Sequence, residues 1–214
     1  IFYTAGMKTA AGSKVYAEFV PDFDATSVAK IKEAGGIILG KAVTTEFATS
    51  DPSPTRNPWN PQHTPGGSSS GSSAAVAARM VPAALGSQTG GSTCRPAAYN
   101  GVVGLKATYG RISRYGVVPV SWSLDHVGIL VRTVADAALM LTVISGEDPN
   151  DPGSLALPVP DFSQQMAESC KPPRIGLVKE YFSETATPEM WSHTQAVAQK
   201  LATAGAEVVE LGLP

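Results

Sequence analysis

The sequence is poor in the residues that cross-link small domains or bind metals. Cys94 and Cys170 are its two cysteines, which are too few for a disulfide framework or a cysteine-based metal site. Its three histidines, His63, His126 and His193, are scattered along the chain. We therefore expect no zinc site and no other metal or cofactor.

Charge is also scarce. Charged residues make up 16% of the 214 residues, against about 25% in an average globular protein, and the net charge at pH 7 is −2. A protein that binds nucleic acid or an anionic membrane through its charge needs a basic excess, which is absent. The sequence has no apolar run near the about 18 residues of a membrane span and no signal peptide. We expect a cytoplasmic protein that contacts neither nucleic acid nor membrane.

Apolar residues and turn-forming residues are abundant instead. Hydrophobic residues make up 43% of the chain, which excludes disorder and allows a sizeable core, and 21 glycines and 17 prolines indicate many turns. The sequence begins at Ile1, without an initiator Met, and ends at Pro214 after a strand-like run. We expect a fragment of a larger domain, with uncovered sheet edges and apolar surface that promote association.

Helical and strand-like patterns alternate, which predicts α/β layers. A helix is expected after Asp24 as its N-cap and before Gly35-Gly36, followed by a short buried strand at Ile37-Ile38-Leu39. The other expected elements are helices at 74–80 and 133–144, a buried strand at 101–106, a C-terminal βαβ unit at 174–179, 188–204 and 207–211, and loops at 51–67 and 86–95.

Five serines stand in the first of two glycine-rich loops, within GGSSSGSSAAVAARM at 66–80. A flexible linker would not run directly into an alanine-rich helix, and a P-loop would need a following Gly-Lys-Ser/Thr. GSSSG at 67–71 matches the nucleophile elbow of α/β-hydrolases around Ser69, but that motif needs a strand immediately before it. The loop alone leaves a linker, an anion cradle and an elbow as open alternatives.

The second loop, GSQTGGSTCR at 86–95, has the composition of an oxyanion site. Gly90 and Gly91 let backbone N–H groups turn inward beside the hydroxyl of Ser92. Clustered donors stabilise the negative charge that develops on a carbonyl oxygen under attack. A tight turn between packed elements would produce the same spacing, so these residues alone do not decide.

Taken together, the two loops resemble the amidase signature family. The motifs that carry the resemblance include GSQTGGSTCRPA and GVVGLKATYGR, and they lie at residues 4–16, 24–48, 66–80, 86–111 and 112–141. The resemblance implies an α/β/α sandwich around a large mixed β-sheet, present here only in part. Residues 1–152 would be the signature core, and residues 153–214 would be a truncated βαβ continuation of the same single domain.

The resemblance implies an amide hydrolase with a Ser–cisSer–Lys relay. Ser92 corresponds to the nucleophile, and Ser68, 24 positions earlier, to the bridging serine. The peptide bond between Gly67 and Ser68 would be cis, and Ser69 corresponds to the serine that orients the lysine. The backbone donors to the oxyanion correspond to Thr89, Gly90, Gly91 and Ser92.

The family's catalytic lysine lies just before the stretch that matches Thr4–Ser13, so it would precede Ile1. A lysine whose pKa is lowered by burial could take a proton from the bridging serine, which takes one from the nucleophile. Lys41 corresponds to a different family lysine that is structural, and Lys8 and Lys106 are weaker candidates for a base. The chain as given is therefore expected to be inactive.

The motif residues depart from the family at two positions. Gln88 stands where Asp most often precedes Thr-Gly-Gly-Ser, and Cys94 stands where Arg often follows the nucleophile, with Arg95 next. We interpret both as marks of a subgroup, with a decayed active site as the alternative. Nothing nearby indicates a lowered thiol pKa for Cys94, so it is not favoured as a nucleophile.

Several other polar and aromatic residues have less specific interpretations. Asp125 and His126 could line the acyl pocket, although structural packing is favoured for both. The remaining expectations are surface or loop-anchoring roles for Arg111 and Arg114, core or pocket-wall roles for Trp59 and Trp122, and a loop position for His63.

The favoured function is hydrolysis of a small carboxylic amide to an acid and ammonia or an amine, through an acyl-enzyme on Ser92. The enzyme could form a homodimer. One alternative is the A subunit of a glutamyl-tRNA(Gln)/aspartyl-tRNA(Asn) amidotransferase, but Trp122 and His126 in SWSLDH depart from the SSLDQ that is usual there. Another is an inactive amidase-like binding protein, which the intact serines disfavour. The sequence does not identify the amide.

Overall fold

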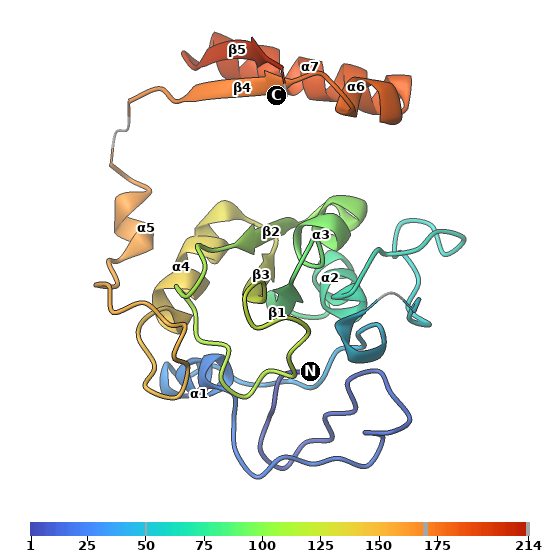
Figure 1. Ribbon diagram of the computed structural model, residues 1–214, viewed down its shortest axis with the longest axis vertical. Helices are drawn as coiled ribbons and strands as arrows, with labels where there is room; N and C mark the ends of the chain where they lie inside the picture. Colours follow the sequence, from blue (N-terminus) through green and yellow to red (C-terminus); the bar gives the residue numbers. More distant parts are fainter. Residues whose placement is uncertain (50, 169–170, 213–214) are drawn as a thin grey trace. The chain divides into compact units, whose positions relative to one another are not determined.

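The computed structural model describes residues 1–49, 51–168 and 171–212. Cys170, which is expected to take part in no disulfide framework or metal site, lies outside these residues. The two compact units of the chain are Ile1–Ala167 and Glu168–Pro214 (Figure 1). The expectation of a single domain with a signature core at 1–152 and a continuation at 153–214 stays a prediction. Residues 153–167 belong to the first unit because the Leu155 N–H donates to the Gly110 carbonyl at 2.8 Å and the Phe162 N–H to the Thr142 hydroxyl at 3.1 Å.

The first unit is built on a three-stranded antiparallel sheet in the order β1–β3–β2. Its strands are β1 (Ala83–Gln88), β2 (Val103–Lys106) and β3 (His126–Val131). β2 confirms the strand expected at 101–106. The loop expected at 86–95 is partly wrong, because residues 86–88 complete β1. Glycines within β1 and β3 weaken the alternating pattern from which a strand is predicted.

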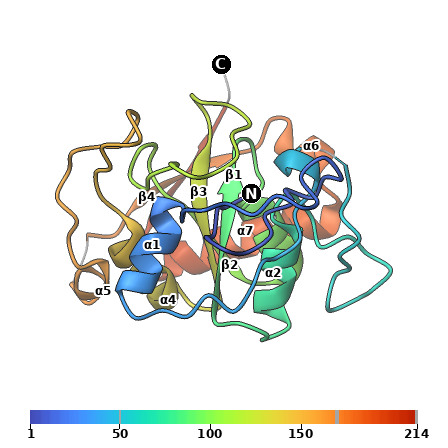
Figure 2. The ribbon, with the colours of Figure 1, turned by 90° about the horizontal axis from the view of Figure 1, so that it is seen from below.

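The two faces of β3 pack against different helices (Figure 2). The helices of this unit are α1 (Thr26–Glu33), α2 (Ser70–Ala77), α3 (Cys94–Asn100), α4 (Val134–Ile144) and α5 (Phe162–Gln165). Val127 and Ile129 are buried on the α4 side, whereas Leu130 is buried on the other side against Val76 of α2 and Ala97 of α3. The unit is therefore the α/β/α sandwich that the sequence predicts.

The segment from Asp24 to Leu39 confirms one expectation and corrects two. The predicted helix is α1, but its N-cap is Ala25, and the Asp24 carboxylate instead pairs with Lys32 at 2.7 Å. The strand expected after it is wrong. Ile37 and Leu39 are 90% and 74% exposed, and this segment pairs with no strand in the described part of the chain. A short apolar run forms a buried strand only where another strand lies beside it.

Two further helices match their expected places with different details. The helix predicted at 74–80 is α2, which begins earlier, at Ser70, with Ser69 as its N-cap residue. The helix predicted at 133–144 is α4, and the Thr133 side chain caps it by accepting the Asp136 N–H at 3.1 Å. Val134 is exposed, so the buried side of α4 does not include it.

The second unit confirms the predicted βαβ pattern. β4 (Arg174–Val178) and β5 (Glu207–Leu211) form a parallel pair, connected through α6 (Phe182–Thr185) and α7 (Pro188–Thr203). Pro188 opens α7, where its missing N–H costs no helical hydrogen bond. No helix in the described residues has the length and apolar character to cross a membrane.

Candidate active site

Ser92 lies in the turn that connects β1 to α3. An open cavity of about 460 Å³ is lined by this turn and its surroundings, namely Thr89, Gly90, Gly91, Ser92, Arg95, Ala48, Thr49 and Val120. Within residues 1–49, 51–168 and 171–212, the backbone N–H groups from Thr89 to Ser92 donate no hydrogen bond to another protein group. The cavity therefore combines a hydroxyl with several free backbone donors.

Gln88 holds the start of α3. Its side-chain Oε1 accepts the backbone N–H groups of Thr93 and Cys94, both at 2.9 Å. The hydroxyl of Thr93, the N-cap residue, makes no capping bond, and Gln88 instead satisfies the first two unpaired N–H groups of the helix, those of Thr93 itself and Cys94. Sequence reasoning noted Gln88 as a departure and missed this role. The sequence did contain a signal for this role, because Gln88 replaces an Asp, and Asp and Gln both carry a side-chain oxygen that accepts N–H groups.

Ser68 is buried at the base of the first serine loop. Its peptide bond with Gly67 is cis, as the resemblance implies. The Ser68 carbonyl accepts the Thr45 N–H at 3.1 Å and the Thr44 hydroxyl at 2.9 Å, two contacts that sequence reasoning missed. Ser68 is 1% exposed, and its own hydroxyl has no hydrogen-bond partner among the described residues. The buried hydroxyls of Ser27, Thr93 and Ser145 are also unpaired among these residues, and Ser68 differs from Ser27 and Ser145 in lying in a loop that is hydrogen-bonded to Ser92.

Hydrogen bonds join the two serine loops into one site. The Ser69 N–H donates to the Ser92 carbonyl at 3.2 Å, and Arg95 Nη2 donates to the Gly67 carbonyl at 2.9 Å. The Ser69 hydroxyl accepts the Ser87 N–H at 3.1 Å and donates to the Ser87 carbonyl at 3.3 Å. Ser69 is thus tied to β1, and a role in orienting a lysine stays a prediction.

Two opposed glycines let both loops approach the sheet. Gly86 in β1 lies opposite Gly128 in β3. A Cβ atom on Gly86 would lie 2.7 Å from the Ser69 hydroxyl oxygen, and one on Gly128 would lie 2.6 Å from Thr93 Cγ2. Both distances are too short for non-bonded atoms, so the missing side chains create the space that the serine loops occupy.

Asp125 braces one wall of the cavity. Its carboxylate accepts the Thr89 hydroxyl at 2.5 Å and the N–H groups of Val120 and Ser121 at 2.7 and 2.9 Å. These contacts fit the packing role favoured for Asp125, but Asp125 and His126 also line a small second cavity beside this one, so the choice between packing and pocket lining stays open. His126 contacts Tyr109, with ring centroids 5.5 Å apart, and is not among the residues that line the Ser92 cavity.

The lysines considered as bases are engaged elsewhere. Partial burial lowers the pKa of Lys41 to about 8, although nearby Asp24 opposes the shift. The Lys41 ammonium donates to the Phe2 carbonyl and, at 3.0 Å, to the Thr4 hydroxyl, which fits a structural lysine. The other two do not contact the serines either: Lys8 pairs with Glu18 and Lys106 donates to the Ala107 carbonyl.

The remaining expectations are settled by exposure and contacts. Trp59 and Trp122 are each 72% exposed, so neither lies in the core, but Trp122 lines a small second cavity and so has the expected pocket-wall position. His63 is an exposed loop residue, as expected. Arg111 lies over the Phe162 ring at 5.3 Å, whereas Arg114 is buried and anchors a loop. The described residues contain no group of three or more His, Cys, Asp or Glu side chains placed to bind a metal.

Comparison with known proteins identifies relatives along the whole chain. The Amidase family model matches residues 1–214. The A subunit of glutamyl-tRNA(Gln) amidotransferase from Geobacter metallireducens is 47% identical over 220 residues, which cover 100% of this chain and 45% of that protein. The corresponding protein from Chromohalobacter salexigens is also 47% identical, with the same coverage. The chain thus spans about half the length of these curated relatives.

Solved structures share the fold. The A subunit of glutamyl-tRNA(Gln) amidotransferase from Thermotoga maritima superposes with a TM-score of 0.93 at 40% identity, over 100% of this chain and 48% of that one. Peptide amidase from Stenotrophomonas maltophilia gives a TM-score of 0.87 at 37% identity, over 100% of this chain and 46% of that one. With its joined serine loops and the match over residues 1–214, the chain belongs to the amidase signature family.

Proposed function

We propose that the protein containing this chain hydrolyses carboxylic amides through Ser92. The observation that carries the proposal is the buried Ser68 hydroxyl, which has no partner among the described residues and lies in the loop bonded to Ser92. Leaving such a hydroxyl unpaired costs folding free energy, about 1–3 kcal/mol. A role of the Ser68 hydroxyl in a proton relay would explain why it is left without a partner.

The proposed reaction follows from the positions of these groups. Ser92 Oγ attacks the amide carbonyl while its proton passes to Ser68 Oγ, and the Ser68 proton passes to a base. The free N–H groups of the Thr89–Ser92 turn hold the oxyanion. The relay then returns a proton to the leaving nitrogen, and water hydrolyses the acyl-enzyme by the same path. By likeness to the family, the base is a lysine that this sequence does not contain.

The substrate we favour is a small carboxylic amide, which yields an acid and ammonia or an amine. A second candidate is release of ammonia from glutamine in a multi-subunit amidotransferase, which the 47% identity to the Geobacter amidotransferase protein supports. Trp122 and His126, which depart from the usual sequence of such proteins, favour the first candidate. The protein would act in the cytoplasm, alone or as a homodimer in the first case and with partner subunits in the second.

Covalent labelling tests the role of Ser92. The protein, in its natural sequence context, is treated with a fluorophosphonate and the modified peptide is mapped by mass spectrometry. We expect an adduct on Ser92, which Ser92→Ala should abolish and whose formation Ser68→Ala should slow by about 10³-fold or more. Ser163→Ala, at an exposed position outside the cavity and outside the loop at 120–125, is the matched control and should label normally.

The other outcomes decide between the alternatives. An adduct on Ser69 would overturn the assignment of the nucleophile, and no adduct on a folded protein would support the inactive alternative or a subunit that needs its partners. Ammonia release is then compared for aliphatic amides and for glutamine, with the protein alone and with any co-purifying subunits. Release from glutamine that depends on such subunits would favour the amidotransferase.

A further inference from the structure

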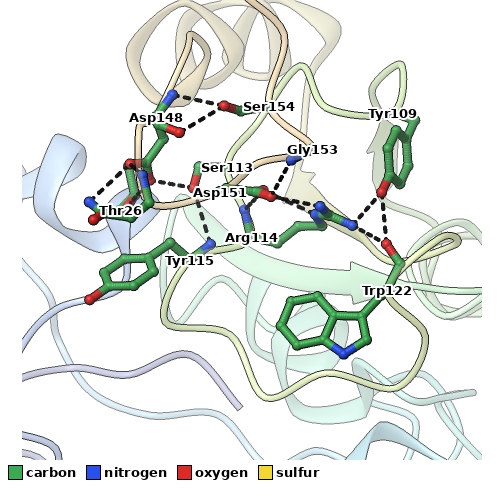
Figure 3. Close-up of polar contacts among 11 residues, drawn as sticks. Thr26, Tyr109, Ser113, Arg114, Tyr115, Trp122, Asp148, Asp151, Gly153 and Ser154 are labelled. Atoms are coloured by element: carbon green, nitrogen blue, oxygen red, sulfur yellow. Dashed lines mark hydrogen bonds and ion pairs between the residues drawn. The ribbon is translucent and has the colours of Figure 1, made fainter.

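A buried ion pair between Arg114 and Asp151 lies beside the loop that bears Trp122 (Figure 3). Arg114 and Asp151 are only 9% and 4% exposed. The Asp151 carboxylate accepts three N–H groups of Arg114: Nη2 at 2.6 Å, Nε at 3.0 Å and the backbone N–H at 2.8 Å. Asp151 therefore fixes both the backbone and the guanidinium of Arg114.

The pair keeps its charges at neutral pH. Burial alone would raise the pKa of the Asp151 carboxyl, but the hydrogen bonds from Arg114 outweigh it and hold that pKa below its ordinary value. The hydrogen bond to Asp151 in turn raises the pKa of Arg114. Charged partners make hydrogen bonds stronger than neutral ones, so the guanidinium is held firmly in one orientation.

The oriented guanidinium of Arg114 points at a backbone carbonyl in the loop at 120–125, whose Val120 lines the Ser92 cavity. Arg114 Nη1 donates to the Trp122 carbonyl, which also accepts the Tyr109 hydroxyl at 2.7 Å. The same Nη1 donates to the Tyr109 oxygen at 2.6 Å, and the guanidinium lies 4.7 Å from the centre of the Tyr109 ring. Two donors that also bind each other thus converge on the Trp122 carbonyl (Figure 3).

The same loop reaches the Ser92 cavity at its other side. Trp122 lies between Val120, which lines the cavity, and Asp125. Asp125 accepts the Val120 N–H and the hydroxyl of Thr89, which lines the cavity beside Ser92. Polar contacts therefore connect the buried ion pair to the turn that holds the proposed nucleophile.

We propose that Arg114 and Asp151 are positioning residues for the Ser92 site. By holding the Trp122 carbonyl they fix the loop at 120–125, so that Asp125 keeps Thr89 in place for its part in binding the oxyanion. Neither residue lines the cavity, so they act only through this loop. The catalytic part of this inference rests on the proposed amidase function.

The chain offers a matched control for Asp151. Asp148 is buried on the same segment and accepts the Thr26 and Ser113 hydroxyls at 2.5 and 2.6 Å. Its hydrogen bonds within the described residues do not reach the loop at 120–125. Asp148→Asn therefore tests the general effect of weakening this segment, and Asp151→Asn tests the contact path to the cavity.

The experiment compares both variants with the native protein in its natural sequence context. Hydrogen exchange by mass spectrometry is followed in peptides that cover 118–126, and the rate of Ser92 labelling by a fluorophosphonate is measured in parallel. Asp151→Asn should speed exchange in these peptides and slow labelling about 10- to 100-fold, because a small displacement of the site is enough. Asp148→Asn should change labelling less than about twofold.

A milder variant guards against misfolding. Tyr109→Phe removes one donor to the Trp122 carbonyl and should give smaller changes of the same kind. In combination with Asp151→Asn its effect should be less than multiplicative, because both changes release the same carbonyl. Thermal unfolding checks that every variant is folded under the conditions of the assay.

The two readouts separate the inference from the proposed function. Unchanged exchange at 118–126 in Asp151→Asn, or equal effects of Asp148→Asn and Asp151→Asn, would overturn the contact path. Faster exchange at 118–126 with unchanged labelling of Ser92 would support the contact path and overturn its catalytic importance. If the native protein is not labelled at Ser92 at all, the proposed function fails, and the exchange result still decides the path.

Discussion

At Gly128, one added methyl group should disturb the Ser92 turn. The Cβ of Gly128→Ala would overlap Thr93, the N-cap residue of α3, so either α3 or β3 must move. Overpacking of this kind costs about 1–3 kcal/mol. We expect Gly128→Ala to lower the free energy of unfolding by that amount, measured by urea denaturation, and to slow fluorophosphonate labelling of Ser92.

Gly40→Ala is the control for this prediction. A Cβ atom on Gly40 would meet no atom within 4 Å, so this substitution should change the free energy of unfolding by less than about 0.5 kcal/mol. Equal stability of Gly128→Ala and Gly40→Ala would show that α3 does not depend on the bare backbone of β3.

Single residues differ in how well the sequence predicts their roles. Ser68 and Ser92 can be singled out as candidates because their motifs are local and specific, and their proposed catalytic roles stay predictions. Gln88 and Asp125 act through backbone groups that the folded loops bring to them, so their partners cannot be inferred from neighbouring letters. Asp151 shows no sequence signal of its own, because its partner Arg114 is 37 positions away.

At the scale of elements, two helix caps should behave differently when removed. Gln88→Ala leaves the N–H groups at the start of α3 without an acceptor and should cost about 1–3 kcal/mol. Thr133→Ala removes the cap of α4 and should cost about 0.5–2 kcal/mol. Only Gln88→Ala should also slow labelling of Ser92, because α3 follows directly from that residue.

Gln88→Glu refines the same test. It keeps a side-chain oxygen acceptor, and a carboxylate is favourable at a helix N-terminus. Its unfolding free energy should therefore stay close to that of the native protein. If Gln88→Ala is labelled at the native rate, the cap matters for α3 and not for the position of Ser92.

Elements with strong local signals were predictable. Pro188 and the helical pattern after it predict α7, and short apolar runs predict the strands β4 and β5 on either side. The run at Ile37 has the same local character but no neighbouring strand among the described residues, so its prediction failed. Gly86 and Gly128 interrupt the alternating patterns from which β1 and β3 would be predicted, and the close approach of the serine loops requires both glycines.

For the whole of the first unit, acid should be destabilising. Burial would raise the pKa of the Asp148 and Asp151 carboxyls, but hydrogen bonds from Ser113 and Arg114 hold both pKa values below the ordinary value of about 3.9. A lowered pKa in the folded state stabilises the fold above the unfolded value. This contribution is lost as the pH falls through the folded value.

Urea unfolding at a series of pH values measures this contribution. The free energy of unfolding should fall steadily below about pH 4. Asp151→Asn should be less stable than the native protein at pH 7, and the difference should shrink in acid because the native carboxylate then becomes neutral. If the unfolding free energies of Asp151→Asn and the native protein differ by the same amount at pH 7 and pH 3, the lowered pKa of the Asp151 carboxyl would be contradicted.

The alternation of side chains between the two faces of β3 also limits where insertions and deletions can be tolerated. Val127 and Ile129 face one layer, and Gly128 faces Thr93 in the other. A slip of β3 by one residue would turn a bulky side chain toward Thr93 and a glycine toward the core. Insertions and deletions between β2 and β3 must therefore be absorbed within the connecting loop. Since Trp122 and Asp125 lie in that loop, we expect length variation among relatives to fall outside residues 120–126.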